Sequence, residues 1–230
     1  MSKLFGKAKK KAESQPQPQP KPQQPAPPVF VSHWLRGVDV SHWEPEVDWV
    51  KAKASGIEFM FAKATEGIYY HDPMFVKHVK AAKAAGVLVG AYHFFHHSNA
   101  ARAQFLTYAE TVDSLGFKLD LPPVLDWEQQ GGPKSQIFTA HEWLTLAEAH
   151  YGRKPMIYTG PSFMAALQVS PDFAAYPLWV AHYQTKAPRV PAPWKQWTIW
   201  QDSETGTVPG VTSHVDTNWY NGTLDSLRAL

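Results

Sequence analysis

The amino-acid sequence predicts an α/β protein in which short strands and helices alternate and close into a compact β/α barrel. Residues 29–230 contain about eight apolar runs of strand length, most of them followed by a segment with helical periodicity. Repeated strand–helix units favour a parallel sheet. Eight strands in roughly 200 residues favour closure into a barrel. A doubly wound open sheet is the alternative, but no glycine-rich phosphate loop follows the first strand.

Each element is expected from its apolar period and from the residues that bound it. The strands are expected, in chain order, over residues 36–40, 58–63, 87–95, 123–128, 156–159, 178–181, 198–200 and 214–218. The helices are expected over residues 46–55, 72–85, 99–115, 135–151, 162–168 and 223–230. The helical signals after residue 160 are weak, so the second half of the barrel should carry short helices.

Residues with special backbone preferences mark the ends of several elements. Gly56 closes the first helix and Gly86 closes the second. The second helix also has a start signal, since Asp72 supplies a cap and Pro73 occupies the first helical position. The run at residues 123–128 is a buried strand bounded by a proline pair and by a polar loop.

Residues 1–28 differ in composition from the rest of the chain. The first eleven residues, MSKLFGKAKKK, are rich in lysine, and residues 14–28 consist almost entirely of Gln and Pro. Such a segment cannot bury apolar area, so we expect a disordered tail ahead of one folded domain at residues 29–230. The tail carries six Lys and one Glu, a net charge of +5. It is expected either to contact an anionic surface or to remain a solvated tail.

Composition excludes several classes of protein and of site. Residues 29–230 carry 16 basic and 19 acidic side chains, a net charge of −3, which is unlike a nucleic-acid-binding fold. The chain has no cysteine, so disulfides and thiolate sites are excluded. The N-terminal segment lacks the apolar core of a signal peptide. No stretch approaches the roughly 18 apolar residues of a transmembrane helix.

The strand at residues 123–128 ends in two carboxylates, Asp126 and Glu128. Side chains alternate along a strand, so both acids face one side, roughly 7 Å apart at Cβ, while Trp127 faces the core. Flexible side chains bring the carboxyl groups to about the 5–9 Å spacing of glycosidases. Desolvation and repulsion would raise one pKa and leave the other group ionised. Two solvated acids at a strand end are the alternative.

Polar and aromatic residues stand at the ends of the other predicted strands, where barrel enzymes place their chemistry. Two further acids are expected at this mouth, Asp39 and Asp216. Residues expected to line the cleft and bind substrate are Glu66, Tyr92, His93, Tyr158, Trp179 and Gln201. Four acids around one mouth are costly unless a metal ion or a cationic transition state uses them.

The sequence favours the cationic transition state over the metal ion. His93, His96 and His97 lack the HExxH spacing, so no metal and no cofactor is predicted. An oxocarbenium-like transition state suits both the acids and the aromatic residues Tyr92, Tyr158 and Trp179, because sugar rings stack on flat aromatic faces.

Six segments occur in an order that resembles glycoside hydrolase family 25, the Chalaropsis-type lysozymes. They are GVDVSHW at residues 37–43, FAKATEG at 61–67, GAYHFF at 90–95, VLDWE at 124–128, TGTVPGV at 205–211 and VDTNWYNG at 215–222. The resemblance implies a modified, flattened β/α (TIM-like) barrel. It also implies a lysozyme that cleaves the β-1,4 bond between N-acetylmuramic acid and N-acetylglucosamine in peptidoglycan.

The resemblance assigns roles by position. It implies that Glu128 is the general acid/base, that Asp126 is its partner carboxylate, and that Asp39 and Asp216 are further catalytic acids. One departure is Asp202, in IWQD, where the family often has an aromatic residue. This extra acid is expected to alter substrate contacts or the pH optimum.

These inferences predict a monomeric muramidase that acts on peptidoglycan glycan strands with net retention. Without a signal peptide it should remain in the host cytoplasm before release and then act at the bacterial cell wall or periplasm. The alternatives are a catalytically silent wall-binding or virion structural module, and a metal-dependent deacetylase of the same polymer. A virion enzyme and a bacterial enzyme remain open, but the missing signal peptide and the missing wall-binding repeats favour a phage endolysin.

Overall fold

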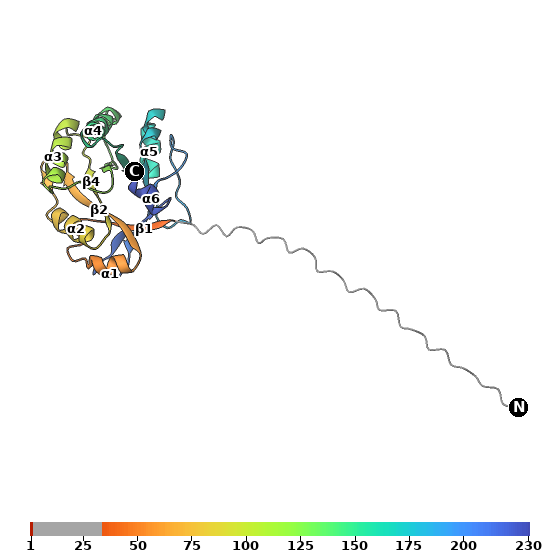
Figure 1. Cartoon of the computed structure of the whole chain (residues 1–230). Coiled ribbons are helices and arrows are strands. Elements are labelled where there is room, and N and C mark those ends of the chain that lie inside the picture. The colour runs from red at the N-terminus through yellow and green to blue at the C-terminus, as the bar shows by residue number, and fades with distance from the viewer. Residues whose placement is uncertain (2–33) are drawn as a thin grey trace. The chain divides into compact units, whose positions relative to one another are not determined.

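The computed structural model describes Met1 and residues 34–230 (Figure 1). The predicted tail beyond Met1, and its predicted boundary with the folded domain, lie outside the described residues. Within residues 34–230, no helix combines the length and the apolar character needed to cross a bilayer.

Eight strands close into a barrel, as predicted from the sequence. In ring order they are β1 (Leu35–Val40), β2 (Ile57–Glu66), β4 (Leu88–Phe94), β5 (Pro123–Asp126), β6 (Met156–Thr159), β7 (Leu178–Ala181), β8 (Ile199–Gly206) and β9 (Val215–Tyr220). β9 pairs with β1 and so completes the ring. The two-residue strand β3 (Tyr70–His71), which was not predicted, pairs with the end of β2.

The prediction of a parallel sheet is correct for seven strands and wrong for β9. Strands β1, β2 and β4–β8 run parallel, whereas β9 is antiparallel to both β8 and β1. Only residues 207–214 separate β8 from β9. That is too short for the crossover that a parallel pair needs, so the two strands form a hairpin. The beginning of β9 therefore lies at the same end of the barrel as the carboxyl ends of the other strands.

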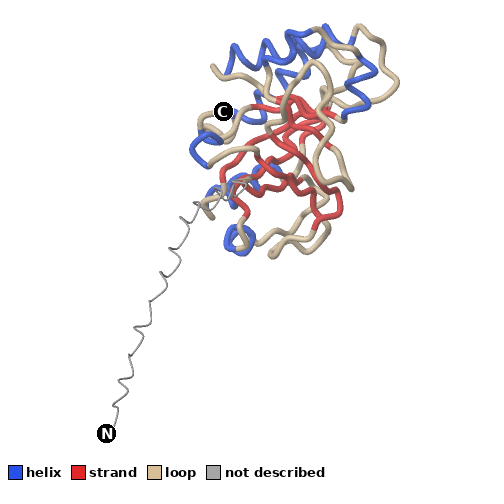
Figure 2. Tube along the Cα trace, turned by 90° about the vertical axis from the view of Figure 1, so that its right-hand side faces the viewer, coloured by secondary structure: helices blue, strands red, loops and turns tan. Residues whose placement is uncertain are grey.

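Helices lie at the periphery of the strands (Figure 2). They are α1 (Trp49–Ala54), α2 (Phe75–Ala84), α3 (Ala101–Asp113), α4 (Gln136–Tyr151), α5 (Pro161–Leu167), the 3₁₀ helix η1 (Pro171–Ala175) and α6 (Leu224–Arg228). The helices after β6 are short, as expected. α2 begins three residues later than predicted, because Asp72 accepts hydrogen bonds from the Met74 and His42 amides and so connects two loops.

Alternation along the strands separates two apolar layers. On β2, Phe59 and Phe61 face the barrel interior, whereas Met60 and Ala62 face the layer beneath the helices. Leu227 of α6 also belongs to the interior cluster. The interior is thus filled with side chains, and the cleft above it has a solid floor.

Two glycines make room for the interior rings. A Cβ atom on Gly37 would lie 2.3 Å from Phe59 Cε2. On Gly90 it would lie 2.4 Å from Phe61 Cδ1 and 3.0 Å from Leu121 Cβ. The distances of 2.3 Å and 2.4 Å to the two phenyl rings are far below van der Waals contact. These strand positions therefore exclude any side chain while the phenyl rings keep their places.

We therefore expect Gly90→Ala to lower the free energy of unfolding by about 1–3 kcal/mol through overpacking. Urea unfolding measures the change. In a double-mutant cycle with Phe61→Leu, which removes the clashing ring edge, the combined loss should be smaller than the sum of the single losses by about 1 kcal/mol. Strictly additive losses would show that the added methyl group does not meet the Phe61 ring.

Candidate active site

The carboxyl ends of the parallel strands surround a cleft with a volume of 640 Å³. Among the described residues, a single basic side chain lines it, Lys63, together with six acids: Asp39, Glu44, Asp126, Glu128, Glu204 and Asp216. Its aromatic lining consists of Trp43, Tyr92, Phe94, Tyr158, Trp179 and Tyr183. A strongly acidic cleft with ring-shaped apolar surfaces suits an uncharged or cationic ligand with flat faces.

Seven of the ten residues predicted for the site line this cleft. They are Asp39, Tyr92, Asp126, Glu128, Tyr158, Trp179 and Asp216. Gln201 lies directly beneath the cleft, and Glu66 and His93 do not line it. The sequence did not predict the contributions of Trp43, Glu44, Lys63, Phe94, Tyr183 and Glu204.

Asp126 and Glu128 face the cleft together, as strand alternation predicts. Trp127 between them points the other way: it is fully buried, and its Nε1 donates to Gln136 Oε1 at 2.9 Å. Asp126 is 7% exposed, and its Oδ1 has no hydrogen-bond partner within residues 34–230. This oxygen is itself buried, and a buried carboxylate oxygen without a partner disfavours the ionised form.

The environment raises the pKa of both acids, whereas the sequence predicted that one would stay low. Burial, followed by the negative charge of Glu128, raises the pKa of Asp126 well above its ordinary value. Burial, followed by the charge of Asp39, raises the pKa of the half-buried Glu128. The Lys63 ammonium opposes both shifts. The two carboxyl groups consequently compete for protons and titrate as a pair.

Asp39 and Asp216 form a second acidic pair because β9 is antiparallel. They are directly opposite each other in the β1–β9 ladder. Burial, followed by the charge of Asp39 and a hydrogen bond to it, raises the pKa of Asp216 to about 9. Burial also raises the pKa of Asp39. At neutral pH Asp216 therefore holds a proton and donates it in a hydrogen bond to Asp39.

Gln201 connects this acidic pair to two phenols. Its Oε1 accepts hydrogen bonds from Tyr158 Oη at 2.8 Å and Tyr183 Oη at 2.6 Å. Its Nε2 donates to Asp39 Oδ2 at 2.9 Å and to Asp216 Oδ2 at 3.3 Å. Gln201 is almost completely buried, so it orients the groups that line the cleft and is covered by them.

Asn218 completes the fixation of Asp39. Its Nδ2 donates to Asp39 Oδ2 at 2.7 Å, and its Oδ1 accepts from Trp179 Nε1 at 2.8 Å. The Trp179 ring is thereby held in the cleft wall by the same network that holds the acid.

The expectation that His93 lines the cleft is wrong. Tyr92 and Phe94 line the cleft, so alternation directs the side chain between them toward the helices. The imidazole is fully buried, lies 2.8 Å from Thr65 Oγ1 and 3.1 Å from Gln104 Oε1, and stacks on Trp143. Burial lowers the pKa of His93 to about 4, so the ring is neutral.

Glu66 does not line the cleft, but it contacts Lys63, which does. Its carboxylate forms an ion pair with Lys63 and lies 2.9 Å from His96 Nε2. A register shift between Lys63 and Thr65 disturbs the alternation of β2, so that Glu66 pairs in register with Phe94 and can reach Lys63, although Glu66 does not itself line the cleft. Burial, which raises the pKa of Glu66, is outweighed by these two partners, and the pKa is lowered. Glu66 therefore holds Lys63 in position.

The extra acid near the mouth is Glu204 and not Asp202. Asp202 accepts a hydrogen bond from Thr217 Oγ1 at 2.8 Å and is absent from the cleft lining. β8 has register shifts after Gln201 and after Ser203, and beyond them Glu204 enters the cleft. These irregularities leave no signal in the residue pattern.

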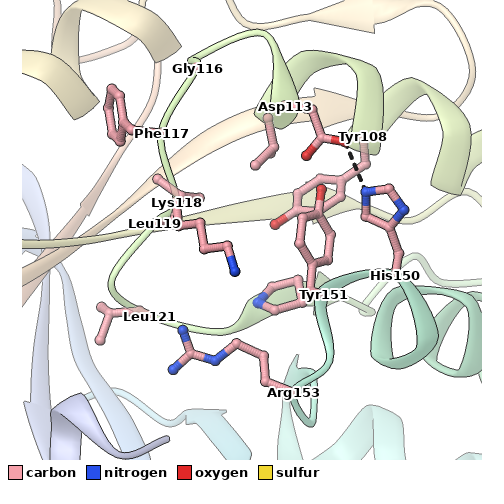
Figure 3. A pocket seen from close by; sticks show the side chains of 12 residues that line it. Tyr108, Asp113, Gly116, Phe117, Lys118, Leu119, Leu121, His150, Tyr151 and Arg153 are labelled. Atoms are coloured by element: carbon pink, nitrogen blue, oxygen red, sulfur yellow. Dashed lines mark hydrogen bonds and ion pairs between the residues drawn. The ribbon is translucent and has the colours of Figure 1, made fainter.

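A second pocket, of 370 Å³, lies at the other end of the strands (Figure 3). Pro123, the first residue of β5, and Arg153, which precedes β6, both line it. His150 pairs with Asp113 at 2.8 Å in its wall. None of the predicted site residues reaches this pocket, and in barrels of this kind the amino-terminal end contributes stability more than chemistry.

Comparison with known proteins agrees with this arrangement. Residues 38–211 match the sequence profile of Glycosyl hydrolases family 25. The protein YegX of Escherichia coli K12 is 38% identical over 206 residues, which cover 86% of this chain and 74% of YegX. Lysozyme M1 of Streptomyces globisporus is 36% identical over 213 residues, covering 85% of this chain and 71% of the relative.

A solved structure shows the same fold. The crystal structure of the bacterial lysozyme from Streptomyces coelicolor superposes with a TM-score of 0.78 at 34% sequence identity, covering 85% of this chain and 96% of that one. Since the matching profile also spans well over half of the sequence, this chain belongs to glycosyl hydrolases family 25.

Proposed function

We propose that this glycoside hydrolase is a muramidase that cleaves the β-1,4 bond between N-acetylmuramic acid and N-acetylglucosamine in peptidoglycan, with net retention. The observation that carries the proposal is the pair Asp126 and Glu128, the last residue of β5 and the second residue after it, which both line a single cleft. Relatives named as lysozymes support the choice of polymer.

Glu128 is the general acid in this proposal. It is the more exposed member of the pair, and burial, followed by the charge of Asp39, raises its pKa, which favours the protonated form that a general acid needs. As the glycosidic C–O bond breaks, Glu128 transfers that proton to the leaving oxygen. In the second step the resulting carboxylate removes a proton from the water that attacks the anomeric carbon.

Asp126 then stabilises the charge that develops on the substrate. Burial is the main cause of the raised pKa of Asp126; once Glu128 is protonated, the negative charge that adds to burial is removed, and Lys63 favours the ionised form. The Asp126 carboxylate, which lines the cleft, can accept the N–H of the 2-acetamido group while the acetamido oxygen bonds to the anomeric carbon. Direct attack by Asp126 is the alternative, and both routes retain the anomeric configuration because each involves two displacements.

We further propose that the enzyme acts as a monomer, without a cofactor, on glycan strands at the bacterial cell wall. The acid and its partner carboxylate are two residues apart in the same chain, so a second copy is not needed to bring them together. We also propose that the enzyme resides in the host cytoplasm before release.

Glu128→Gln should preserve folding and abolish lysis, because the amide has nearly the same shape but cannot donate the proton. We expect kcat to fall by about 10²–10⁴. Release of reducing ends from purified peptidoglycan measures kcat, and thermal unfolding checks the fold. Asp202→Asn is the matched control, since Asp202 is an acid outside the cleft, and it should keep kcat near the wild-type value. If Glu128→Gln keeps more than about a tenth of wild-type kcat, another group is the general acid.

The raised pKa of Asp216 predicts a pH-dependent cost in stability. The ordinary value is 3.8 and the folded value is about 9, so between these pH values the folded state binds more protons than the unfolded state. Stability contributed by this site therefore falls as pH rises through that window. Asp216→Asn, which is neutral in both states, should gain stability relative to wild type between about pH 5 and pH 8, by about 1–3 kcal/mol.

Urea unfolding of both proteins at these two pH values measures the difference. The Asp202→Asn variant controls for removal of an acid elsewhere on the hairpin. A difference between Asp216→Asn and wild type that stays constant with pH would mean that Asp216 is ionised in the folded protein.

The tail is proposed to add electrostatic attraction to the wall without supporting the fold. Deleting residues 1–28 should leave the melting temperature and the activity on soluble glycan fragments unchanged. Activity on intact sacculi at low salt should fall, because six lysines near an anionic surface add attraction that ions screen. Near 0.3 M salt, where the Debye length is about 5–6 Å, the two enzymes should converge. Equal activity on sacculi at low salt would assign the tail no part in wall contact.

A further inference from the structure

An exposed tryptophan stands at the edge of the cleft. Trp43, in the turn after β1, is 74% exposed and yet lines the cleft that contains the catalytic acids. Leaving an indole in water forgoes the favourable burial that most of the other tryptophans in this chain obtain. An exposed aromatic ring at a binding cleft is typical of a surface that a ligand covers.

The turn that carries Trp43 is held by its own hydrogen bonds. The Glu44 amide donates to Ser41 O at 3.2 Å, and the Trp43 amide donates to Ser41 Oγ at 3.3 Å. The Ser41 amide donates in turn to Glu44 Oε2 at 2.9 Å. The backbone under the indole therefore has few conformations to lose when a ligand binds.

A second set of bonds fixes the turn to its neighbours. Asp72 Oδ2 accepts from the His42 amide at 3.1 Å and lies 2.9 Å from His42 Nδ1. Tyr70 Oη lies 2.9 Å from the same imidazole nitrogen. The His42 ring, so held, lies against the Trp43 indole with ring centroids 4.6 Å apart and planes at 38°. One side of the indole is thus supported while the side chain remains mostly open to solvent.

The position of Trp43 separates it from the bond that is cleaved. It follows β1, whereas Asp126 ends β5 and Glu128 follows it, and β2 and β4 lie between β1 and β5 in the ring. Three strand spacings correspond to roughly 14 Å along the barrel wall. A ring stacked on Trp43 is therefore a different sugar from the one that reacts beside Glu128.

We propose that Trp43 forms an outer sugar-binding subsite, in which its indole stacks on a glycan ring beyond the two that flank the cleaved bond. Glu44 contributes an acceptor to this subsite: its Oε2 receives the bonds from Ser41, and its Oε1 is left for a sugar hydroxyl. The inference rests on the proposed function, because it explains how the same cleft binds a long glycan strand in preference to a short one.

Other exposed rings lack this combination of features. Tyr69 is 85% exposed and Phe138 is 79% exposed, but neither lines the cleft. Tyr69 directly precedes Tyr70, whose hydroxyl group contacts the His42 ring that supports Trp43. Tyr69→Ala is therefore a matched control for the loss of an exposed ring near the mouth.

The test compares peptide-free peptidoglycan glycan strands of defined length. Trp43→Ala should lower kcat/KM more on long strands than on the shortest oligosaccharide that is cleaved, by about tenfold, and Trp43→Phe should restore part of that difference. Tyr69→Ala should show no dependence on length. In a Glu128→Gln background, which retains the cleft without turnover, adding Trp43→Ala should raise the Kd for long strands by about tenfold.

The outcomes separate this inference from the proposed function. If wild type releases no reducing ends from any strand, the muramidase assignment fails, and binding by the Glu128→Gln protein still reports on the subsite. If wild type is active and Trp43→Ala loses the same factor on long and short strands, the outer subsite is refuted. Length dependence in Tyr69→Ala equal to that in Trp43→Ala would likewise overturn it, because the effect would then not depend on lining the cleft.

Discussion

The pairing of β9 with β1 is the contact on which the rest of this site depends. It closes the barrel, and because it is antiparallel it brings Asp216 to the mouth opposite Asp39. The same ladder places Asn218 where it can hold both Asp39 and Trp179. A parallel final strand would have presented its other end to the cleft and removed this acid from the site.

Crowding of carboxyl groups is the cost of that arrangement. Burial raises the pKa of Asp39, Asp126, Glu128 and Asp216, so the folded cleft holds protons that the unfolded chain would release. The positive charge of Lys63, which Glu66 holds in position, partly compensates for the acids. Gln201 accepts hydrogen bonds from two phenols and donates hydrogen bonds to two acids. In enzymes, unfavourable electrostatics at the active site commonly lower the stability of the fold, and favourable interactions elsewhere in the structure offset that loss.

The barrel and most of its acidic cleft could be predicted from the sequence, because both follow from strand periodicity. Alternation places Asp126 and Glu128 on one face, and eight strand-length runs predict closure. Alternation would also have excluded His93 once Tyr92 was placed in the cleft. The direction of β9 is implicit in its short connection. The entry of Glu204, by contrast, depends on register shifts that no residue type marks, and Tyr183 lies in a loop without periodic signal.

Tyr158 and Trp179 belong both to the apolar interior of the barrel and to the wall of the cleft. The interior core is therefore the dielectric boundary beneath the acids, as well as the support of the strands. A change of volume deep in the barrel, such as one that shifts the Trp179 ring away from Asn218, would alter the polarity around Asp39 without touching the cleft itself. Of the buried residues described in the layer beneath the helices, Val40 alone also lines the cleft. Neutral substitutions should accordingly be tolerated more readily in the layer beneath the helices than in the barrel interior.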